Sequence, residues 1–218
     1  EKVMSYLSEV TVMMGVPTYY TRLLNNKNFS KKMCQNLRLF ISGSAPLLEE
    51  TFFEFEKRCG HKILERYGMT ETNMNTSNPL KGKRKPGTVG PPLPGIKIRI
   101  TNNQNKTLSH NEIGNLQVKG PNVFSGYWKM PEKTADDFTD DGFFNTGDKG
   151  QIDEEGYVSI IGRTKDVVIT GGLNAYPKEI ELFIDKMSSV VESAVIGVPE
   201  NDLGEAVIAI VVVKNKEL

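Results

Sequence analysis

The chain has 218 residues, of which 38% are hydrophobic and 25% are charged, as in an ordinary globular protein. Its 27 basic and 27 acidic residues cancel, so no overall charge draws it to nucleic acid or to an anionic membrane. Two cysteines, two histidines and the lack of a CxxC pair argue against a disulfide framework and a zinc site.

We expect no membrane span, because the longest apolar run, residues 206–213, is far too short to cross a bilayer. The first residues do not form a signal peptide, and we therefore expect a cytoplasmic protein. The chain begins within helical-looking sequence and stops just after a predicted strand, which indicates a fragment of a longer protein.

The first part of the chain predicts alternating strands and helices. Residues 10–16 are apolar and partly β-branched, which is typical of a strand, and Pro17 is well suited to open a helix. Residues 37–41 alternate like a second strand, and residues 42–46, Ser-Gly-Ser-Ala-Pro, form a turn.

A clearly marked helix follows this turn. We expect Pro46 to open it and Gly60 to end it, with Glu49 and Glu50 near its positive N-terminal end. Residues 62–67 form the next strand. Strand, turn, helix and strand at this spacing predict a βαβ unit, which implies a parallel sheet.

Residues 73–95 are rich in Asn, Gly, Pro and Lys and predict an ordered loop region, in which the basic run 81–85 is a solvated loop. Short β segments follow, and they predict a small antiparallel subdomain. These segments are residues 96–100, 114–119, 143–152 and 157–161. A hairpin-like turn at residues 153–156 joins the last two.

Alternation resumes near Lys165 and predicts a second, α+β domain, so we divide the chain into residues 1–164 and residues 165–218. The elements expected in the second part are strands at 167–170, 190–198 and 206–213 and a helix opened by Pro177. The predicted fold class is α/β, with a βαβ unit and a small antiparallel β subdomain, followed by the beginning of a small α+β domain.

Three segments could build a nucleotide site, and the first is the turn at residues 42–46. It lies where a parallel strand gives way to a helix, the place where open α/β sheets bind ligands. Its small side chains let a ligand approach the backbone, and free N–H groups at the start of a helix attract anions. The alternative is a tight turn that contacts no ligand.

The second segment is Tyr-Gly-Met-Thr-Glu-Thr, residues 67–72, at the end of the next strand. The ring of Tyr67 can stack on a base, and the hydroxyl of Thr70 can bond a phosphate oxygen. Glu71 can hold Mg²⁺ while phosphates complete the shell of the metal. The alternative is a core tyrosine followed by a capped turn.

The third segment is Thr-Gly-Asp at residues 146–148, followed later by Gly162-Arg163. An ionised carboxylate such as Asp148 can accept hydrogen bonds from both hydroxyls of a ribose. Arg163 can hold a phosphate or ribose oxygen. The alternatives are a turn aspartate and a surface ion pair.

Other familiar motifs are missing from the sequence. It contains neither a GxxxxGK[ST] phosphate loop nor a GxGxxG dinucleotide loop after a strand. It also lacks the Gly-x-Ser-x-Gly turn of serine hydrolases.

Taken together, the segments resemble the adenylate-forming superfamily of acyl-CoA synthetases, peptide-synthetase adenylation domains and luciferases. Five motifs occur in the order of that family, and together they are highly specific. They are residues 42–47, 67–71, 126–134 with 141–148, 162–166 and 171–181. The resemblance covers nearly the whole chain and implies the C-terminal part of the large AMP-binding domain, followed by the start of the small C-terminal domain.

Within the superfamily, residues 15–24 and 65–75 are most similar to malonyl-CoA synthetases. A dicarboxylate needs a cation in its pocket, because its distal carboxylate is costly to bury unpaired. Arg22 is our candidate for that cation, since a guanidinium meets a carboxylate with two hydrogen bonds. The alternative is that Arg22 faces solvent.

The resemblance implies a ligase that uses ATP, Mg²⁺ and coenzyme A and belongs to fatty acid metabolism. The acid, malonate in this interpretation, gives an acyl-adenylate and pyrophosphate, and the thiol of CoA then displaces AMP. Two alternatives stay open: a ligase for another short-chain or aromatic acid, and a non-catalytic AMP-binding module. No macromolecular partner is implied, and the sequence does not determine an oligomeric state.

The resemblance also assigns roles to single residues. Thr70 and Glu71 are the catalytic residues, with Glu71 as the ligand of Mg²⁺. Lys165 is the hinge about which the C-terminal domain turns between the half-reactions, and Gly171 and Gly172 approach the CoA arm. The acid substrate is expected to contact Arg22, Ser42 and Met69. The nucleotide is expected to contact Gly43, Ser44, Ala45, Pro46, Glu65, Arg66, Tyr67, Gly68, Thr70, Asp148 and Arg163.

Two parts of the family's pattern are missing. The phosphate loop rich in Ser, Thr and Gly, with its lysine, does not precede Tyr67, and the adenylation lysine should lie beyond Leu218. We therefore expect the fragment alone to be a poor catalyst.

Overall fold

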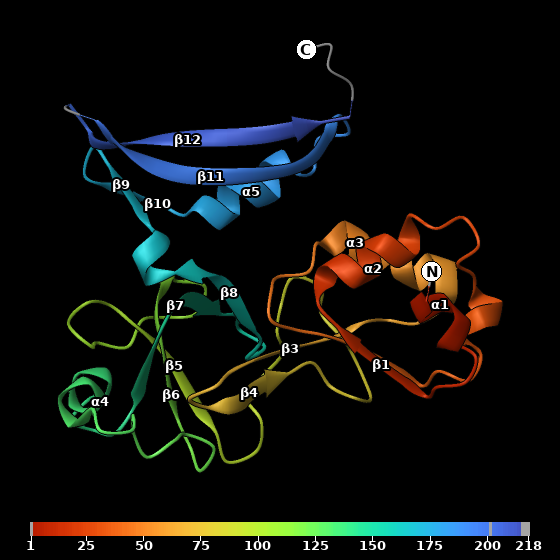
Figure 1. Cartoon of the computed structure of the whole chain (residues 1–218). Helices are drawn as coiled ribbons and strands as arrows, with labels where there is room; N and C mark the ends of the chain where they lie inside the picture. The colour runs from red at the N-terminus through yellow and green to blue at the C-terminus, as the bar shows by residue number, and fades with distance from the viewer. Residues whose placement is uncertain (1, 201, 215–218) are drawn as a thin grey trace.

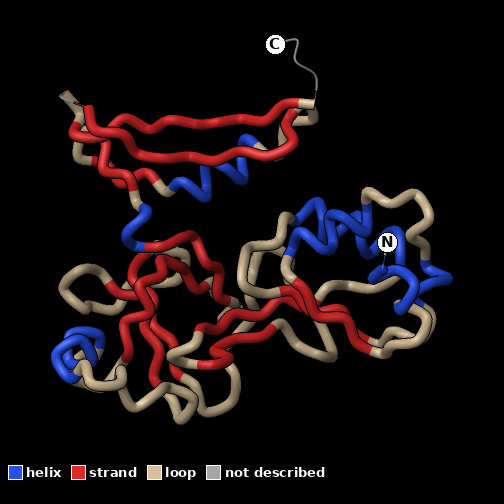
Figure 2. The backbone as a smooth tube through the Cα atoms, in the orientation of Figure 1, coloured by secondary structure: helices blue, strands red, loops and turns tan. Residues whose placement is uncertain are grey.

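The computed structural model describes residues 2–200 and 202–214, and its strands form three four-stranded sheets. Figure 1 labels the elements along the chain, and Figure 2 shows helices beside the first sheet and against the last one. The predicted α/β fold is confirmed.

The first sheet has the strand order β1-β2-β3-β4. It contains the parallel strands β1 (Val12–Gly15), β2 (Leu39–Ser42) and β3 (Leu64–Met69), with β4 (Asn73–Ser77) antiparallel at its edge. The parallel pairing of β2 with β3 on either side of a helix confirms the predicted βαβ unit.

Strand β4 corrects the expectation that residues 73–95 form only a loop. Asn73 has a φ of 52°, which reverses the chain so that Thr76 lies opposite Tyr67. The sequence of β4, Asn-Met-Asn-Thr-Ser, lacks the apolar alternation by which a strand is recognised, although the side chains of Asn75 and Thr76 are buried.

The helices α1 (Lys2–Tyr6), α2 (Pro17–Leu24), η1 (Lys31–Cys34) and α3 (Glu49–Cys59) lie beside the first sheet, as Figure 1 shows. Pro17 opens α2 as predicted, because its fixed φ and missing N–H suit the first helical position.

The start of α3 differs from the prediction. Pro46 does not open the helix, which begins at Glu49, because Leu48 keeps an extended backbone with a ψ of 137°. The backbone groups of residues 43–47 therefore remain outside the helix, and the Leu48 carbonyl accepts its first hydrogen bond, from the N–H of Phe52. The predicted end is confirmed, since Gly60 has a φ of 79° and caps the last turn.

An aromatic core joins the helices to the sheet. Tyr20 and Phe55 meet edge to face with ring centroids 5.3 Å apart, and Phe40 of β2 lies 4.9 Å from Phe55. The hydroxyl of Tyr20 donates to the carbonyl of Ile41 in β2. Each aromatic pair contributes about 1 kcal/mol beyond the burial of its area, so α2 and α3 are fixed firmly against β2.

Arg58 ties the end of α3 to the end of α2. Its guanidinium donates to the carbonyls of Leu24 at 2.6 Å, Asn26 at 2.9 Å and Phe29 at 3.2 Å. Leu24 is the last residue of α2, so its carbonyl lacks a helical partner. The Asn26 carbonyl also accepts the N–H of Phe29 at 3.1 Å. A single charged side chain therefore satisfies three backbone acceptors.

The second sheet is antiparallel, with the order β5-β6-β7-β8, and confirms the predicted subdomain. Its strands are β5 (Lys97–Thr101), β6 (Gly114–Lys119), β7 (Phe144–Ile152) and β8 (Val158–Arg163). The helix α4 (Pro131–Asp137) was not predicted, because it buries none of its side chains and has no apolar periodicity.

The basic run at residues 81–85 is not a freely solvated loop. Lys83 lies 3.1 Å from the carboxylate of Glu155, and Lys85 pairs with both Asp153 and Glu155. Arg84 donates to backbone carbonyls. The run is therefore held against the turn between β7 and β8.

The third sheet has the order β10-β9-β12-β11, and its pairs are antiparallel. Its strands are β9 (Val168–Thr170), β10 (Leu173–Ala175), β11 (Val190–Glu200) and β12 (Gly204–Val213). The helix α5 (Pro177–Ile184), opened by the predicted proline, packs against β11, and η2 (Thr164–Asp166) leads into this part from β8. The predicted boundary at Lys165 falls within η2, and the division into domains stays a prediction.

Within residues 2–200 and 202–214, no helix has both the length and the apolar character needed to span a membrane.

Replacing Arg58 with Ala should lower the free energy of unfolding by about 2 kcal/mol, because three carbonyls lose a charged donor. Urea unfolding of the protein that carries this chain measures the effect as a lower midpoint with an unchanged slope. Lys57→Ala, one residue earlier on the exposed face of α3, serves as the matched control. Equal midpoints for wild type and Arg58→Ala would contradict this role.

Candidate functional site

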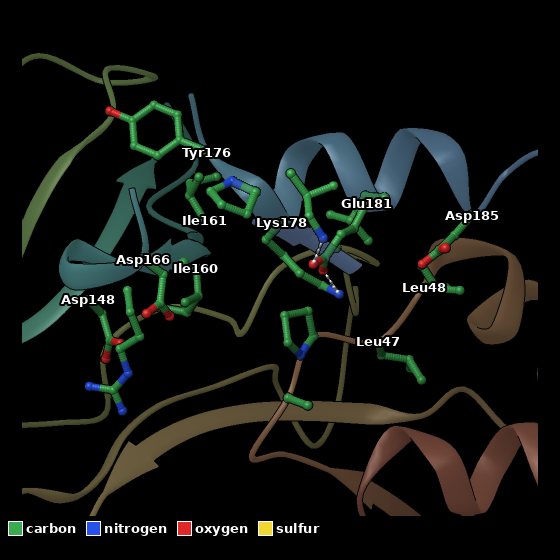
Figure 3. Close-up of a pocket in the computed structure, with 18 of the residues that line it drawn as sticks. Leu47, Leu48, Asp148, Ile160, Ile161, Asp166, Tyr176, Lys178, Glu181 and Asp185 are labelled. Carbon is green, nitrogen blue, oxygen red and sulfur yellow. Dashed lines mark hydrogen bonds and ion pairs between the residues drawn. The ribbon is translucent and has the colours of Figure 1, made fainter. Parts of the chain in front are cut away.

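A cavity of about 730 Å³ lies where the loops of the first sheet, the second sheet and α5 meet. Figure 3 shows it, with Leu47 and Leu48 on one side, Asp148 and Ile160 on another, and Lys178 and Glu181 of α5 facing them. The predicted nucleotide residues that line it are Ser44, Ala45, Pro46, Glu65, Arg66, Tyr67, Gly68, Asp148 and Arg163, and the predicted hinge residue Lys165 lies there too.

The turn after β2 contributes one edge of the cavity. Ser44 has a φ of 68°, a left-handed conformation that is uncommon for residues other than glycine. A Cβ on Gly43 would lie 3.3 Å from the carbonyl oxygen of Arg66, so glycine lets this turn run close to β3. Ser42 is fully buried, and its hydroxyl has no hydrogen-bond partner among the described residues.

Tyr67, Asp148 and Arg163 form a hydrogen-bonded cluster beside this turn. The hydroxyl of Tyr67 donates to one carboxylate oxygen of Asp148, and Nε of Arg163 lies 2.9 Å from the other. Burial raises the pKa of Asp148, although the Tyr67 hydrogen bond and the Arg163 charge act in the opposite direction. Burial, with the nearby Asp148, also raises the pKa of Tyr67, which keeps its hydroxyl a donor.

The second sheet fixes the position of this carboxylate. Asp148 and Arg163 lie opposite each other in the pairing of β7 with β8. The Asp148 N–H donates to the hydroxyl of Thr146 at 3.1 Å, and that hydroxyl donates to the Leu116 carbonyl at 2.8 Å. Gly147, with a φ of 73°, allows the tight turn of the backbone between Thr146 and Asp148.

Glu65 brings a second buried carboxyl group to the cavity. Its side chain is 5% exposed, and burial raises its pKa to about 8. Backbone N–H groups of Leu47 and Gly87 lower the pKa only in part, and the neighbouring Glu49 raises it further. Glu65 is therefore largely neutral at pH 7 and can act as both donor and acceptor.

Arg66, the next residue of β3, is a cation without a carboxylate partner among the described residues. Its two terminal nitrogens contact only the sulfur atoms of Met74 and Met14, which are weak acceptors. Its Nε is buried and has no partner within the described part of the chain. Such a cation favours an anionic ligand.

Glu71 and Thr70 follow β3 and lie outside the cavity lining. Oε1 of Glu71 accepts a hydrogen bond of 3.3 Å from the hydroxyl of Tyr127, and the side chain of Thr70 is exposed. Within residues 2–200 and 202–214, no group of three or more His, Cys, Asp or Glu side chains could hold a metal. One carboxylate and one hydroxyl nevertheless fit Mg²⁺, which is commonly held by one or two carboxylates together with substrate phosphates.

Other predicted residues also lie outside the cavity lining. Arg22 is exposed in the last turn of α2. Gly171 and Gly172, with φ values of 55° and 80°, form an exposed turn between β9 and β10. The sulfur of Met69 lies 3.9 Å from the hydroxyl of Tyr67, next to the cluster. Ser42 and Gly43 belong to the turn but do not line the cavity. The binding roles of all these residues stay predictions.

Sequence reasoning missed the residues that α5 contributes. Nζ of Lys178 lies 2.9 Å from Oε2 of Glu181, a pair drawn in Figure 3, and Oε1 of Glu181 accepts the N–H of Val195 in β11. Asp185 lines the same cavity. These side chains are ordinary for an exposed helix, and only the fold turns them toward the predicted nucleotide segments.

Comparison with known proteins identifies two matching families. The family described as AMP-binding enzyme matches residues 5–128, and the family described as AMP-binding enzyme C-terminal domain matches residues 179–218. The first match covers more than half of the chain, so the chain belongs to that family.

Among curated proteins, a malonate–CoA ligase of Arabidopsis thaliana is 43% identical over 94% of this chain and 35% of its own length. A long-chain-fatty-acid–CoA ligase of Yersinia pestis is 39% identical over 94% of this chain and 36% of its own length. The chain therefore spans only about a third of the length of these relatives.

Among solved structures, the ATP-bound MatB from Rhodopseudomonas palustris is 60% identical, with a TM-score of 0.95. The match covers 100% of this chain and 43% of that chain. The architecture described above is therefore that of the corresponding part of an adenylate-forming enzyme.

The buried carboxyl group of Glu65 predicts a specific pH dependence of stability. The folded protein keeps this proton up to about pH 8, whereas the unfolded chain releases it near its ordinary pKa of 4.5. The folded state therefore binds more protons within this window, and the free energy of unfolding falls as the pH rises through it.

Glu65→Gln should match the wild type near about pH 5 and be more stable by about 3 kcal/mol near about pH 9, because the amide never ionises. Urea unfolding at several pH values measures the difference. Glu50→Gln, an exposed neighbour on α3, is the control and should show no such trend. Parallel pH profiles for wild type and Glu65→Gln would show that Glu65 is ionised in the folded protein.

Proposed function

We propose, from the premise that the chain belongs to the family of AMP-binding enzymes, that the protein carrying it uses ATP to join a carboxylic acid to coenzyme A. The observation that carries this proposal is the buried Asp148, held by Tyr67 and Arg163 at the edge of the cavity. The names of the relatives support it, since each is called a CoA ligase.

The nucleoside would bind between the Ser44–Pro46 turn and the ring of Tyr67. The carboxylate of Asp148 has lone pairs left after its contacts with Tyr67 and Arg163, and it can accept hydrogen bonds from both ribose hydroxyls. The hydrogen bond from the Tyr67 hydroxyl to Asp148 fixes the orientation of the ring, which therefore offers a fixed stacking surface. Glu65 and the turn would contact the base.

The reaction follows from the chemistry of the acid. A carboxylate is a poor electrophile, so one of its oxygens attacks the α-phosphorus of ATP, the bond to the leaving phosphate oxygen breaks, and pyrophosphate departs. The thiolate of CoA then attacks the acyl carbon of the adenylate, and the bond to AMP breaks. The protein contributes mainly positioning and neutralisation of phosphate charge.

Thr70 and Glu71 would act on the phosphates. We propose Glu71 as the ligand of Mg²⁺ and the exposed hydroxyl of Thr70 as a donor to a phosphate oxygen. Bound Mg²⁺ neutralises charge that develops on the phosphates. Oε2 of Glu71 has no hydrogen-bond partner among the described residues and is available to the metal.

Malonate is the acid that we propose. We assign its second carboxylate to Arg66, which the sequence analysis had placed on the nucleotide. A second carboxylate in the acid would give this guanidinium a partner in place of two methionine sulfurs. Arg22 remains the alternative cation proposed from the sequence, although its side chain is exposed. Ser42 and Met69 lie near the turn and the cluster and are proposed to contact the acid.

The second half-reaction would use the part of the chain after β8. Lys165 in η2 is proposed as the hinge, and the glycine turn at Gly171 and Gly172 would approach the CoA arm after rotation. The cytoplasmic location and the part played in fatty acid metabolism remain predictions of the sequence alone.

The ligase proposal is tested by pyrophosphate release from the protein that carries this chain, supplied with malonate, acetate or a fatty acid. We expect release with malonate to be the fastest of the three. Equal rates with all three acids would favour a ligase of other or broad specificity. ATP or AMP binding without acyl-adenylate would instead indicate a non-catalytic nucleotide-binding module.

Arg66→Met should lower kcat/KM for malonate by about 30- to 160-fold, the loss of a charge-assisted hydrogen-bond pair of about 2–3 kcal/mol. Acetate, which has no second carboxylate, should be affected little. Arg22→Ala in the same assay decides between the two arginines. A selective loss of malonate activity in Arg22→Ala alone would move the proposed role from Arg66 to Arg22.

A further inference from the structure

The motif Gly126-Tyr127-Trp128 belongs to a segment that runs beside the loop after β3 and has no assigned task so far. We propose that Tyr127 is a positioning residue, which holds one oxygen of Glu71 so that the other is directed to the metal of metal–ATP. This inference rests on the proposed function, because it takes Glu71 as the metal ligand.

The segment contacts the loop after β3 through its backbone and side chains. The N–H of Phe124 donates to the carbonyl of Glu71 at 2.8 Å, and Nδ2 of Asn122 donates to the carbonyl of Thr72 at 2.6 Å. The hydroxyl of Tyr127 donates to Oε1 of Glu71 at 3.3 Å. Phe124 thus holds the main chain of Glu71 and Tyr127 holds its carboxylate, and both lie more than fifty positions later in the sequence.

Tyr127 is itself fixed on two sides. Its N–H donates to the hydroxyl of Thr134 in α4 at 2.9 Å, and that hydroxyl donates to the carbonyl of Met130 at 2.9 Å. Gly126 has a φ of 148°, and a Cβ there would lie 2.7 Å from the methyl group of Thr134. The Tyr127 ring meets the ring of Phe124 edge to face, with centroids 4.8 Å apart.

The charges around the phenol favour its role as a donor. The phenol lies close to two carboxylates, those of Glu71 and Asp137. Nζ of Lys133 lies 2.6 Å from the carboxylate of Asp137 and compensates that second negative charge. The hydrogen bond that the hydroxyl makes in the structure goes to Oε1 of Glu71.

A carboxylate held at one oxygen loses less rotamer freedom when its other oxygen meets a cation. Partners that orient a metal ligand in this way commonly change metal affinity by about tenfold or more. Because Tyr127→Phe removes only the hydroxyl, the ring stays available to pack on Phe124. The backbone of Glu71 should then keep its position, whereas its carboxylate should lose its preferred orientation.

The test is Mn²⁺-dependent binding of ATP, measured by electron paramagnetic resonance on the protein that carries this chain. In Tyr127→Phe the Mn²⁺ concentration for half-saturation should rise about tenfold, while binding of AMP without metal stays unchanged. Tyr157→Phe is the matched control, because it removes a hydroxyl that donates to the Lys83 carbonyl, outside the site. It should leave both measurements as in the wild type.

Glu71→Gln shows whether Tyr127 acts through Glu71. Tyr127→Phe should add nothing in the Glu71→Gln background, since the two act as one unit. An unchanged Mn²⁺ requirement in Tyr127→Phe, additive effects in the double variant, or ATP binding that ignores Mn²⁺ in the wild type would each overturn the inference. Metal-dependent ATP binding without pyrophosphate release from any acid would instead overturn the ligase proposal and leave the role of Tyr127 standing.

Discussion

Asp148 is 4% exposed, and its carboxylate meets the hydroxyl of Tyr67 and the guanidinium of Arg163 where the first and second sheets come together. Burying a charge is costly unless it is paired and hydrogen-bonded. The carboxylate is therefore stable only while β3, β7 and the end of β8 stay close. The Asp148 carboxylate is also the group proposed to bind the ribose, so the packing of the sheets and the proposed site depend on one cluster.

Two adjacent residues of β3, in contrast, have buried polar groups that are not fully paired. Glu65 is a buried acid whose pKa lies near 8, and Arg66 has a buried Nε without a partner among the described residues. Most buried polar groups in proteins are satisfied, so each exception needs an explanation. The ligands proposed above would supply one: a base beside the neutral acid and a carboxylate beside the cation. Such incompletely paired groups lower the stability of the folded protein, and they are common at functional sites.

Much of the fold could be predicted from local patterns. Apolar and β-branched residues marked β1, alternation marked β2, and short β segments marked the antiparallel sheet. Pro17, Gly60 and Pro177 marked helix ends. The failures have local causes as well. Strand β4 is polar because its buried side chains are Asn75 and Thr76, and α4 has no buried face. The start of α3 was set by the backbone of Leu48 rather than by the proline before it.

The sequence by itself determined which short segments could form a nucleotide site, because each carries residues suited to a base, a phosphate or a ribose, and the first two lie at strand ends. Only the tertiary structure decided that Tyr67 touches Asp148 across 81 positions, that α5 closes the cavity, and that Tyr127 holds Glu71. The reason is physical: local periodicity reports which face of an element is buried. It carries no information about which distant side chain will lie opposite, since that depends on how whole sheets pack.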